Sequence, residues 1–327
     1  ALELMPGNKI RKYDTWHAMG QGATTGSLVV TLEALKEMHL TPEDIQLIQN
    51  DTKTCPDTGM AGASRSLYMD GNATIIAANK LLAAMRKEDG TLRTYDEMKA
   101  EGIETKYLGR YETNTTPGLC RLDPNTGIGD PTPAFTYCLN LAEVEVDTKT
   151  GKTTVLKFTC VDFVGRIGNI DAVNGQAYSG IMHGIGFALK EDYADVKKHA
   201  NMFGAGTSYI KDVPDDINLI HIDGAISDGP FGSSGASEAF QASGHCAVLN
   251  GIYNACGVRI HEIPALPEKV KAGLDAIAKG EKPYEPKKYF LGSDMYEELE
   301  NIKENPVQVG TQSFYVSLDD PTAERPF

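Results

Sequence analysis

The chain has 327 residues and a net charge of −14, from 45 acidic and 31 basic side chains. Its length is enough for a large core or two domains, and its 41% hydrophobic content is that of a globular protein. The negative charge disfavours nucleic acid and anionic membrane surfaces as partners. No segment approaches the roughly 18 to 20 apolar residues of a membrane span, and we see no secretory signal at the N-terminus. We therefore expect a cytoplasmic protein that binds neither nucleic acid nor membrane.

The six cysteines are scattered along the chain and include no C-x-x-C pair. Zinc and iron–sulfur sites use close pairs, because one loop then supplies two thiolates. None of the seven histidines forms an i, i+4 pair either. We expect no metal held by side chains and no iron–sulfur cluster in this chain.

The first third of the chain predicts two units of strand, loop and helix. Each loop is rich in small residues and lies where α/β proteins place ligands, between a strand and a helix N-terminus. The first unit has a strand over 9–16, a loop over 19–26 and a helix over 27–38; the second has a strand over 45–50, a loop over 51–66 and a helix over 67–86.

Residues 87–133 are polar and broken by Gly and Pro, and we expect them to form an excursion with one short helix over 95–101. A hairpin follows, because two runs rich in Val, Leu, Phe and Thr flank a polar turn. In the next helix, the spacing of Gly180 and Gly184 suggests close packing against a neighbour. The predicted elements are hairpin strands over 134–146 and 153–163, a loop over 165–171, a strand over 219–226, and helices over 239–254 and 265–278. The helix over 239–254 is expected to bury Ala247, Val248, Leu249, Ile252 and Tyr253.

The most informative stretch is Gly-Ser-Ser-Gly-Ala-Ser-Glu at 232–238, just before a predicted helix. Its glycines let the backbone approach a ligand, and successive amides in such a loop form a concavity that suits anions. Glu238 at its end is a candidate general base, which we expect to be buried among Ala236, Ala239 and Phe240. The alternative is an acid that satisfies free amides at a helix start.

Five segments together resemble the C-terminal half of the molybdenum-binding subunit of the xanthine oxidase and aldehyde oxidoreductase family, the molybdenum hydroxylases. The likeness covers residues 9 to about 275. The segments are Met-Gly-Gln-Gly at 19–22, Pro-Asp-Thr-Gly-Met-Ala-Gly-Ala-Ser-Arg-Ser at 56–66, Asn-Gly-Gln-Ala-Tyr-Ser-Gly at 174–180, Gly-Pro-Phe-Gly-Ser-Ser-Gly-Ala-Ser-Glu at 229–238 and Asn-Gly-Ile-Tyr-Asn-Ala-Cys-Gly-Val-Arg-Ile at 250–260.

The resemblance implies an α+β fold of the aldehyde oxidoreductase type, with mixed sheets, helices and two subdomains. We expect a first cofactor-binding subdomain over 1–133 and a second over 134–278 that carries the Glu238 loop. An arm over 279–327 is expected to pack on partner subunits. Such subunits are more than twice this length in the family, so the chain resembles one piece of a split subunit.

The resemblance also implies roles for individual residues. Glu238 would act as the general base, and Tyr13, on the strand before the first loop, would contact the substrate. Ser237 stands where the family commonly has Gly, which leaves the assignment of Glu238 in place. The residues implied in cofactor binding are Gly20, Gln21, Gly22, Gly62, Ala63, Ser64, Arg65, Ser66, Gly168, Asn169, Ile170, Asp171, Ala172, Gln176, Ser234, Gly235, Ala236 and Ser237.

The implied cofactor is molybdenum–molybdopterin cytosine dinucleotide with a terminal sulfido or selenido ligand and no protein ligand to the metal. Partner chains would be a large molybdopterin subunit, an iron–sulfur subunit and an FAD subunit. Members with a divided subunit, the nicotinate dehydrogenases, suggest that an N-heteroaromatic acid is hydroxylated with water as oxygen source, converting nicotinate to 6-hydroxynicotinate. Alternatives are an aldehyde, a purine or carbon monoxide as substrate, or a noncatalytic assembly subunit that closes a partner's cofactor pocket. An acid at the end of the loop favours a catalytic role.

Overall fold

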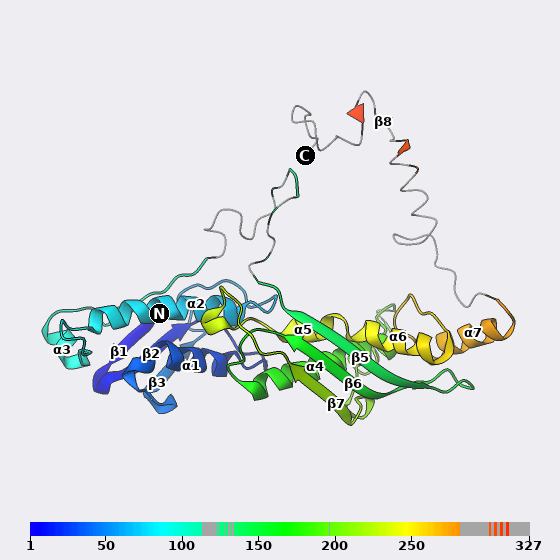
Figure 1. Cartoon of the computed structure of the whole chain (residues 1–327), viewed down its shortest axis with the longest axis horizontal. Helices are drawn as coiled ribbons and strands as arrows, with labels where there is room; N and C mark the ends of the chain where they lie inside the picture. The colour runs from blue at the N-terminus through cyan, green and yellow to red at the C-terminus, as the bar shows by residue number, and fades with distance from the viewer. Residues whose placement is uncertain are drawn as a thin grey trace.

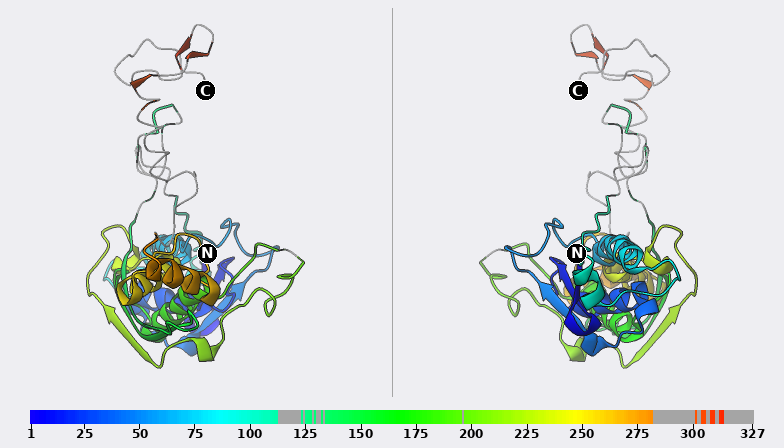
Figure 2. Two further views of the ribbon diagram at one scale, coloured as in Figure 1. Left: turned by 90° about the vertical axis from the view of Figure 1, so that its right-hand side faces the viewer. Right: turned by 90° about the vertical axis from the view of Figure 1, so that its left-hand side faces the viewer.

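The computed structural model describes residues 1–112, 123, 125–127, 129, 132, 134–195, 197–281, 301, 304–305, 308–309 and 312–313. Two mixed β-sheets lie end to end along an elongated body, and helices cover one face of each (Figures 1 and 2). The predicted α+β architecture with mixed sheets is therefore found. The proposed boundaries between subdomains stay predictions.

The first sheet has the strand order β3-β2-β1-β4. Strands β2 (Lys9–Asp14) and β3 (Ile45–Gln49) are parallel, whereas β1 (Leu2–Met5) pairs antiparallel with both β2 and β4 (Lys106–Tyr107). Helix α1 (Ala23–Ala34) connects β2 to β3, and α2 (Ser66–Met85) packs on α1 and β1. The smaller elements of this half are α3 (Tyr95–Ala100) and 3-10 turns at Pro6–Asn8, Lys36–Met38 and Pro42–Asp44.

Two differences from the sequence prediction have local causes. Strands β1 and β4 were not predicted, because four and two residues are too short to show a period. Helix α1 begins four residues earlier than predicted, directly after Gly22, whose left-handed backbone (φ 87°) ends the preceding loop. The other elements of this half match their predicted positions to within a few residues at their ends.

The second sheet has the order β5-β6-β7. Strands β5 (Tyr137–Val146) and β6 (Thr153–Phe163) form the predicted hairpin, and β7 (Asp216–His221) runs parallel to β6. Helix α4 (Ile170–Leu189) links β6 to β7 and packs, with α6 (Gly244–Cys256), on the inner face around buried Phe158. The remaining elements are α5 (Ser237–Ala242), α7 (Pro267–Ala278) and 3-10 turns at Ile210–Asp212 and Pro230–Gly232.

The single helix predicted over 239–254 is wrong, because the chain breaks at Ser243 between α5 and α6. Ser243 has nonhelical torsions (φ −123°, ψ 1°), and its hydroxyl accepts a hydrogen bond of 2.9 Å from the side chain of Asn140. The predicted burial of Tyr253 is also wrong: the ring is exposed, and the Arg259 guanidinium lies 3.7 Å from its centroid. Val248 and Ile252 are buried as predicted.

The close packing predicted at Gly180 and Gly184 is confirmed. A Cβ added at Gly180 would lie 2.6 Å from Cβ of Phe240 on α5, and one at Gly184 would lie 2.9 Å from Cα of Gly244 on α6. Both distances are below those of real Cβ contacts. The glycines therefore let α4 touch the helix pair that follows the Glu238 loop, which fixes that loop relative to α4.

The C-terminal part of the chain is described only in pieces. Strands β8 (Gln308–Val309) and β9 (Gln312–Ser313) pair antiparallel. Most of the predicted arm over 279–327 lies outside the described residues. Within the described part of the chain, no helix is both long and apolar enough to cross a bilayer.

We predict that Gly180→Ala lowers the free energy of unfolding by roughly 1–3 kcal/mol, because the added methyl overlaps Phe240 in a filled core. Gly175→Ala is the matched control: it lies on the same helix with nothing within 4 Å. It should stabilise by roughly 0.5–1 kcal/mol through helix propensity. Denaturant unfolding measures both, and equal effects of the two substitutions would contradict the packing argument.

Candidate functional site

A cavity of about 970 Å³ lies where the two halves of the chain meet. Residues at the N-terminal ends of three long helices line it: Ala23 on α1, Ser66 on α2 and Ala172 on α4. The first amides of a helix lack intrahelical partners and carry partial positive charge. The cavity is therefore large enough for an extended ligand, and the three helix N-termini in its wall favour anionic groups.

Most of the residues expected at the cofactor site line this one cavity. They are Gln21, Gly22, Gly62, Ser64, Ser66, Gly168, Asn169, Ala172, Gln176, Ser234, Gly235, Ala236, Ser237 and Glu238. Gly20, Ala63, Arg65, Ile170 and Asp171 belong to the same loops but do not line it. Arg65 is exposed, and its guanidinium lies 5.8 Å from the ring centroid of Trp16, which does line the cavity. Loops that are far apart in sequence thus meet around a single space.

Tyr13 lies elsewhere. Its ring is buried in the first sheet, and its hydroxyl donates a 2.5 Å hydrogen bond to the carboxylate of Glu3. The Lys106 ammonium lies 3.7 Å from the ring centroid. The residue does not line the cavity, and its polar end is already paired.

Glu238 sits in the first turn of α5, as predicted, and contacts the other half of the chain through Ser64. The Ser64 hydroxyl donates to Oε2 of Glu238 at 2.9 Å, and the Glu238 backbone amide donates to the Ser64 Oγ at 3.0 Å. The expected burial of Glu238 is wrong: the side chain is exposed, because the cavity opens to solvent beside it. The carboxylate is thus oriented by a hydrogen bond.

The loops that carry Ser64 and Glu238 interlock through their backbones. A Cβ on Gly235 would overlap the carbonyl oxygen of Ser64, so only glycine fits there. Ala63 and Ser64 both have φ of +53°, a left-handed conformation that is uncommon for residues with a side chain. Such strain persists only where the surrounding structure enforces it, and it concentrates at functional sites.

Hydrogen bonds from side chains anchor the start of α4 to the second sheet. His221 on β7 lies 2.7 Å from Oδ2 of Asp162 on β6 and 2.8 Å from Oδ1 of Asn174 on α4. The Asn169 side chain caps the helix by accepting from the Ala172 amide at 2.9 Å. Burial raises the pKa of Asp162, and the neighbouring His221 opposes that rise. These contacts fix the helix end that lines the cavity.

A buried ion pair, of which Asp70 lines the cavity, was not anticipated from the sequence. Lys12, only 2% exposed, bonds to Asp70 at 2.7 Å and lies 3.5 Å from Asp14. Asp14 also accepts from Ser27 at 2.6 Å. Burial raises the pKa of Asp70, and the ammonium of Lys12 partly offsets this effect. Lys12 lies two residues after Ile10 and therefore on the same face of β2, which was the available signal, but an ammonium normally points to solvent.

Apolar lining residues were also missed, among them Trp16, Val29, Val30 and Phe231. Phe231 has a signal in the sequence, because it lies between Pro230 and Gly232 in a tight turn. With a φ of +52°, Phe231 is a further residue in the left-handed conformation beside the site. Three strained side-chain-bearing residues thus lie on the two loops nearest Glu238.

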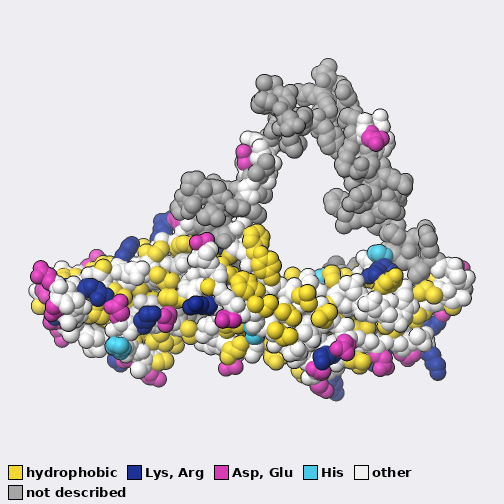
Figure 3. Space-filling view, in the orientation of Figure 1, with side chains coloured by type: hydrophobic (Ala, Val, Ile, Leu, Met, Phe, Trp, Pro, Cys, Tyr) yellow, Lys and Arg dark blue, Asp and Glu magenta, His cyan; other side chains and the backbone are white. Residues whose placement is uncertain are grey.

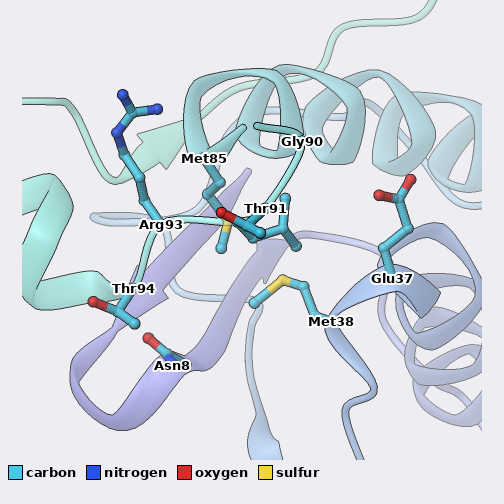
Figure 4. A pocket seen from close by; sticks show the side chains of 9 residues that line it. Asn8, Glu37, Met38, Met85, Gly90, Thr91, Arg93 and Thr94 are labelled. Atoms are coloured by element: carbon cyan, nitrogen blue, oxygen red, sulfur yellow. The ribbon is translucent and has the colours of Figure 1, made fainter. Parts of the chain in front are cut away.

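A smaller pocket of about 390 Å³ lies in the first half of the chain, lined by Met38, Met85 and the 90–94 turn (Figure 4). Its charged lining groups are engaged: Glu37 pairs with Arg86 at 2.5 Å, and Arg93 pairs with Glu101 at 2.8 Å. Nothing in this pocket resembles the convergence of loops at the larger cavity.

A family model for the molybdopterin cofactor-binding domain matches residues 2–214, more than half of the chain. The chain belongs to this family, within the molybdenum hydroxylases. It is 41% identical over 274 residues to the aldehyde oxidoreductase of Megalodesulfovibrio gigas, covering 84% of this chain and 30% of that protein. The crystal structure of the aldehyde oxidoreductase from Desulfovibrio desulfuricans superposes with a TM-score of 0.79 at 44% identity, covering 83% of this chain and 29% of that one.

A more distant relative is the gamma subunit of the 6-hydroxypseudooxynicotine dehydrogenase complex of Paenarthrobacter nicotinovorans. It is 24% identical over 294 residues, which cover 81% of this chain and 36% of that subunit. This chain therefore spans about a third or less of each of these relatives. The resemblance to the molybdenum hydroxylases is confirmed.

The cavity fits a molybdopterin cofactor in size, backbone access and donor chemistry. Gly22 and Gly235 line the cavity with bare backbone, and helix ends favour phosphate. Among the described residues, no group of three or more His, Cys, Asp and Glu could hold a metal ion.

We predict that Gly235→Ala lowers the free energy of unfolding by roughly 1–3 kcal/mol and reduces molybdenum bound per purified complex, because the loops over 62–66 and 232–238 can no longer touch. Metal analysis and thermal unfolding of the complex measure the two effects. Gly175→Ala, the same chemical change at an open position, should leave molybdenum content unchanged. Parental stability and molybdenum content in Gly235→Ala would refute the interlock.

Proposed function

We propose that this chain forms the cofactor cavity wall that carries the general base of a molybdenum-dependent hydroxylase. The observation that carries the proposal is the position of Glu238, whose carboxylate lines the 970 Å³ cavity and is oriented by Ser64 from the opposite loop. A subunit that only closed a partner's pocket would need no oriented carboxylate at the cavity. This argues against the assembly role.

In the proposed reaction, the bound molybdenum cofactor supplies two-electron oxidation of the substrate with oxygen derived from water. Glu238 accepts the proton that leaves the oxygen nucleophile, a step that general bases accelerate. The loops around Gly22, Gly62 and Ser234 would hold the pterin through backbone and hydroxyl groups. Trp16 and Phe231 add apolar surface to the cavity lining, which would limit water around a bound substrate.

We propose the cytosine dinucleotide form of the cofactor, with a terminal sulfido or selenido ligand. The support from this chain is the helix N-terminus at Asn169, which favours phosphate groups. Arg166 also lines the cavity and supplies positive charge, whereas Lys36 is paired there with Glu33 at 2.9 Å. The form can be read by mass spectrometry of cofactor released from the purified complex.

The proposed substrate is an N-heteroaromatic acid such as nicotinate, on the sequence resemblance alone. An aldehyde is a second candidate, favoured by the 41% identity to an aldehyde oxidoreductase. Tyr13 does not line the cavity, so specificity for either substrate depends on other residues. Specificity constants of the native complex for nicotinate and for simple aldehydes decide between the two.

We predict that Glu238→Gln reduces turnover by about 10²- to 10⁴-fold, the usual loss on removal of a general base. The substitution keeps the size of the side chain and a hydrogen-bonding oxygen for Ser64, so molybdenum content should stay near that of the parent complex. Turnover is measured with the preferred substrate, and metal content by elemental analysis. Activity within a few-fold of the parent would remove Glu238 from the mechanism.

We further propose that the chain works in an assembly with a large molybdopterin subunit, an iron–sulfur subunit and an FAD subunit. The outer face of the second sheet supports a partner surface, since β5 exposes Tyr137, Leu139 and Leu141 there. Leu139 and Leu141 are 56% and 58% exposed, and Ile220 on β7 is also exposed. Hydrophobic side chains gather over β5 and β6 in the space-filling view (Figure 3). Contiguous apolar patches of this kind mark interaction sites.

We predict that Leu139→Asp prevents co-purification of the other subunits and leaves the isolated chain without stoichiometric molybdenum, because a charge on this apolar face blocks association. Thr154→Asp is the control, at an exposed position near the polar turn of the same hairpin. Affinity purification with metal analysis gives both readouts. Full assembly of Leu139→Asp, or molybdenum retained by the chain alone, would overturn the docking proposal.

A further inference from the structure

We infer that Ser64 is a positioning residue for Glu238, an inference that rests on the proposed function and deepens it. The two residues are 174 positions apart in sequence but share two hydrogen bonds. Among the described residues, Ser64 is the side chain that hydrogen-bonds the Glu238 carboxylate. The two halves of the chain are therefore joined by hydrogen bonds at Glu238, the proposed base.

The hydrogen-bond inventory of a hydroxyl fixes the direction of these contacts. Ser64 Oγ has one proton to donate and two lone pairs to accept with. The Glu238 amide can only donate, so it occupies one lone pair of Oγ at 3.0 Å. The Ser64 proton is then directed to the ionised carboxylate oxygen at 2.9 Å. The result is a closed ring of two hydrogen bonds between one hydroxyl and one residue.

The same ring survives when Glu238 gains a proton. A protonated carboxyl can donate to the second lone pair of Ser64 Oγ, while the amide keeps its own bond. The hydroxyl rotates, but no heavy atom must move. The orientation of the base is thus preserved on both sides of a proton transfer, which a lone donor such as a lysine could not achieve.

The backbone holds Ser64 independently of Glu238. The left-handed torsions of Ala63 and Ser64 turn the loop back, and the Arg65 amide closes the turn on the Gly62 carbonyl at 3.2 Å. Gly235 packs against the Ser64 carbonyl from the opposite loop. Because its backbone is fixed, the hydroxyl restrains the carboxylate and is not simply carried along by it.

The test uses Ser64→Ala and Ser64→Gly in the assembled, molybdenum-containing complex. Both substitutions remove the hydroxyl, but glycine relieves the left-handed strain at φ +53° whereas alanine does not. Loss of a hydrogen bond to a charged group predicts a fall in kcat of about 10- to 100-fold in both variants. KM and molybdenum content should stay within about twofold of the parent, since the pair acts on proton transfer.

A second readout does not depend on turnover. Modification of Glu238 by a water-soluble carbodiimide, followed by peptide mapping, should be faster in both Ser64 variants, because the carboxylate is no longer held. Ser243→Ala is the matched control: it removes a hydroxyl at the far end of α5 that is bonded to Asn140. It should change neither the labelling rate nor kcat.

Each contrary result has a distinct meaning. Parental kcat and labelling in Ser64→Ala, with turnover abolished in Glu238→Gln, would overturn the role of Ser64 and keep the proposed function. Recovery of kcat in Ser64→Gly alone would show that backbone strain, not the hydroxyl, caused the loss. Loss of molybdenum in both variants would assign Ser64 to cofactor binding. An active Glu238→Gln enzyme would refute the proposed function itself.

Discussion

The contact between Gly235 and the Ser64 carbonyl is the constraint on which the site depends. It joins a loop that precedes α2 to a loop that precedes α5, and it tolerates no side chain at position 235. Close packing of α4 on α5 and α6 through Gly180 and Gly184 fixes the second loop from behind. Without these close contacts, the N-terminal ends of the helices in the two halves of the chain would not line one cavity. With them, three helix N-termini and the carboxylate of Glu238 face a single cavity.

Polar chemistry inside the protein supports the same geometry. The buried Lys12–Asp70 pair lies against the cavity wall, and its charges are costly to bury unless they stay together. The contacts of His221 with Asp162 and Asn174 tie the second sheet to the start of α4. Both groups connect strands to the helices whose N-terminal turns line the cavity. They restrict how far the walls can move apart.

Much of this arrangement was readable from the sequence, because small-residue loops between a strand and a helix are where α/β proteins place ligands. The hairpin at 134–163 and the segments around Gly22, Ser66 and Gly168 were located on pattern and resemblance. The hydrophobic pattern gave a wrong prediction where contacts with distant residues determine the local structure. The helix breaks at Ser243, where Asn140 bonds the hydroxyl and Gly244 packs on Gly184; the Ser243-Gly244 dipeptide was a local signal that the helical pattern outweighed.

The missed and mistaken residues have the same explanation. Tyr13 and Lys12 alternate along β2, and periodicity alone does not tell which neighbour faces a ligand. Glu238 was expected to be buried, because apolar neighbours in sequence were taken as neighbours in space. Its exposure follows from the position of α5 at the cavity mouth. The partner of the carboxylate, 174 residues away, could be found only from coordinates.

In the described part of the chain, the outer face of the second sheet is apolar and exposed, and this has a consequence for copies outside the proposed assembly. Strand β5 is an edge strand, and its outward row begins with Tyr137, Leu139 and Leu141. An exposed apolar edge is a template for pairing with other chains, so it promotes aggregation of unassembled copies. In the proposed assembly, synthesis of this chain would have to be matched to that of the subunit that covers the face. An excess would be a substrate for chaperones and proteases.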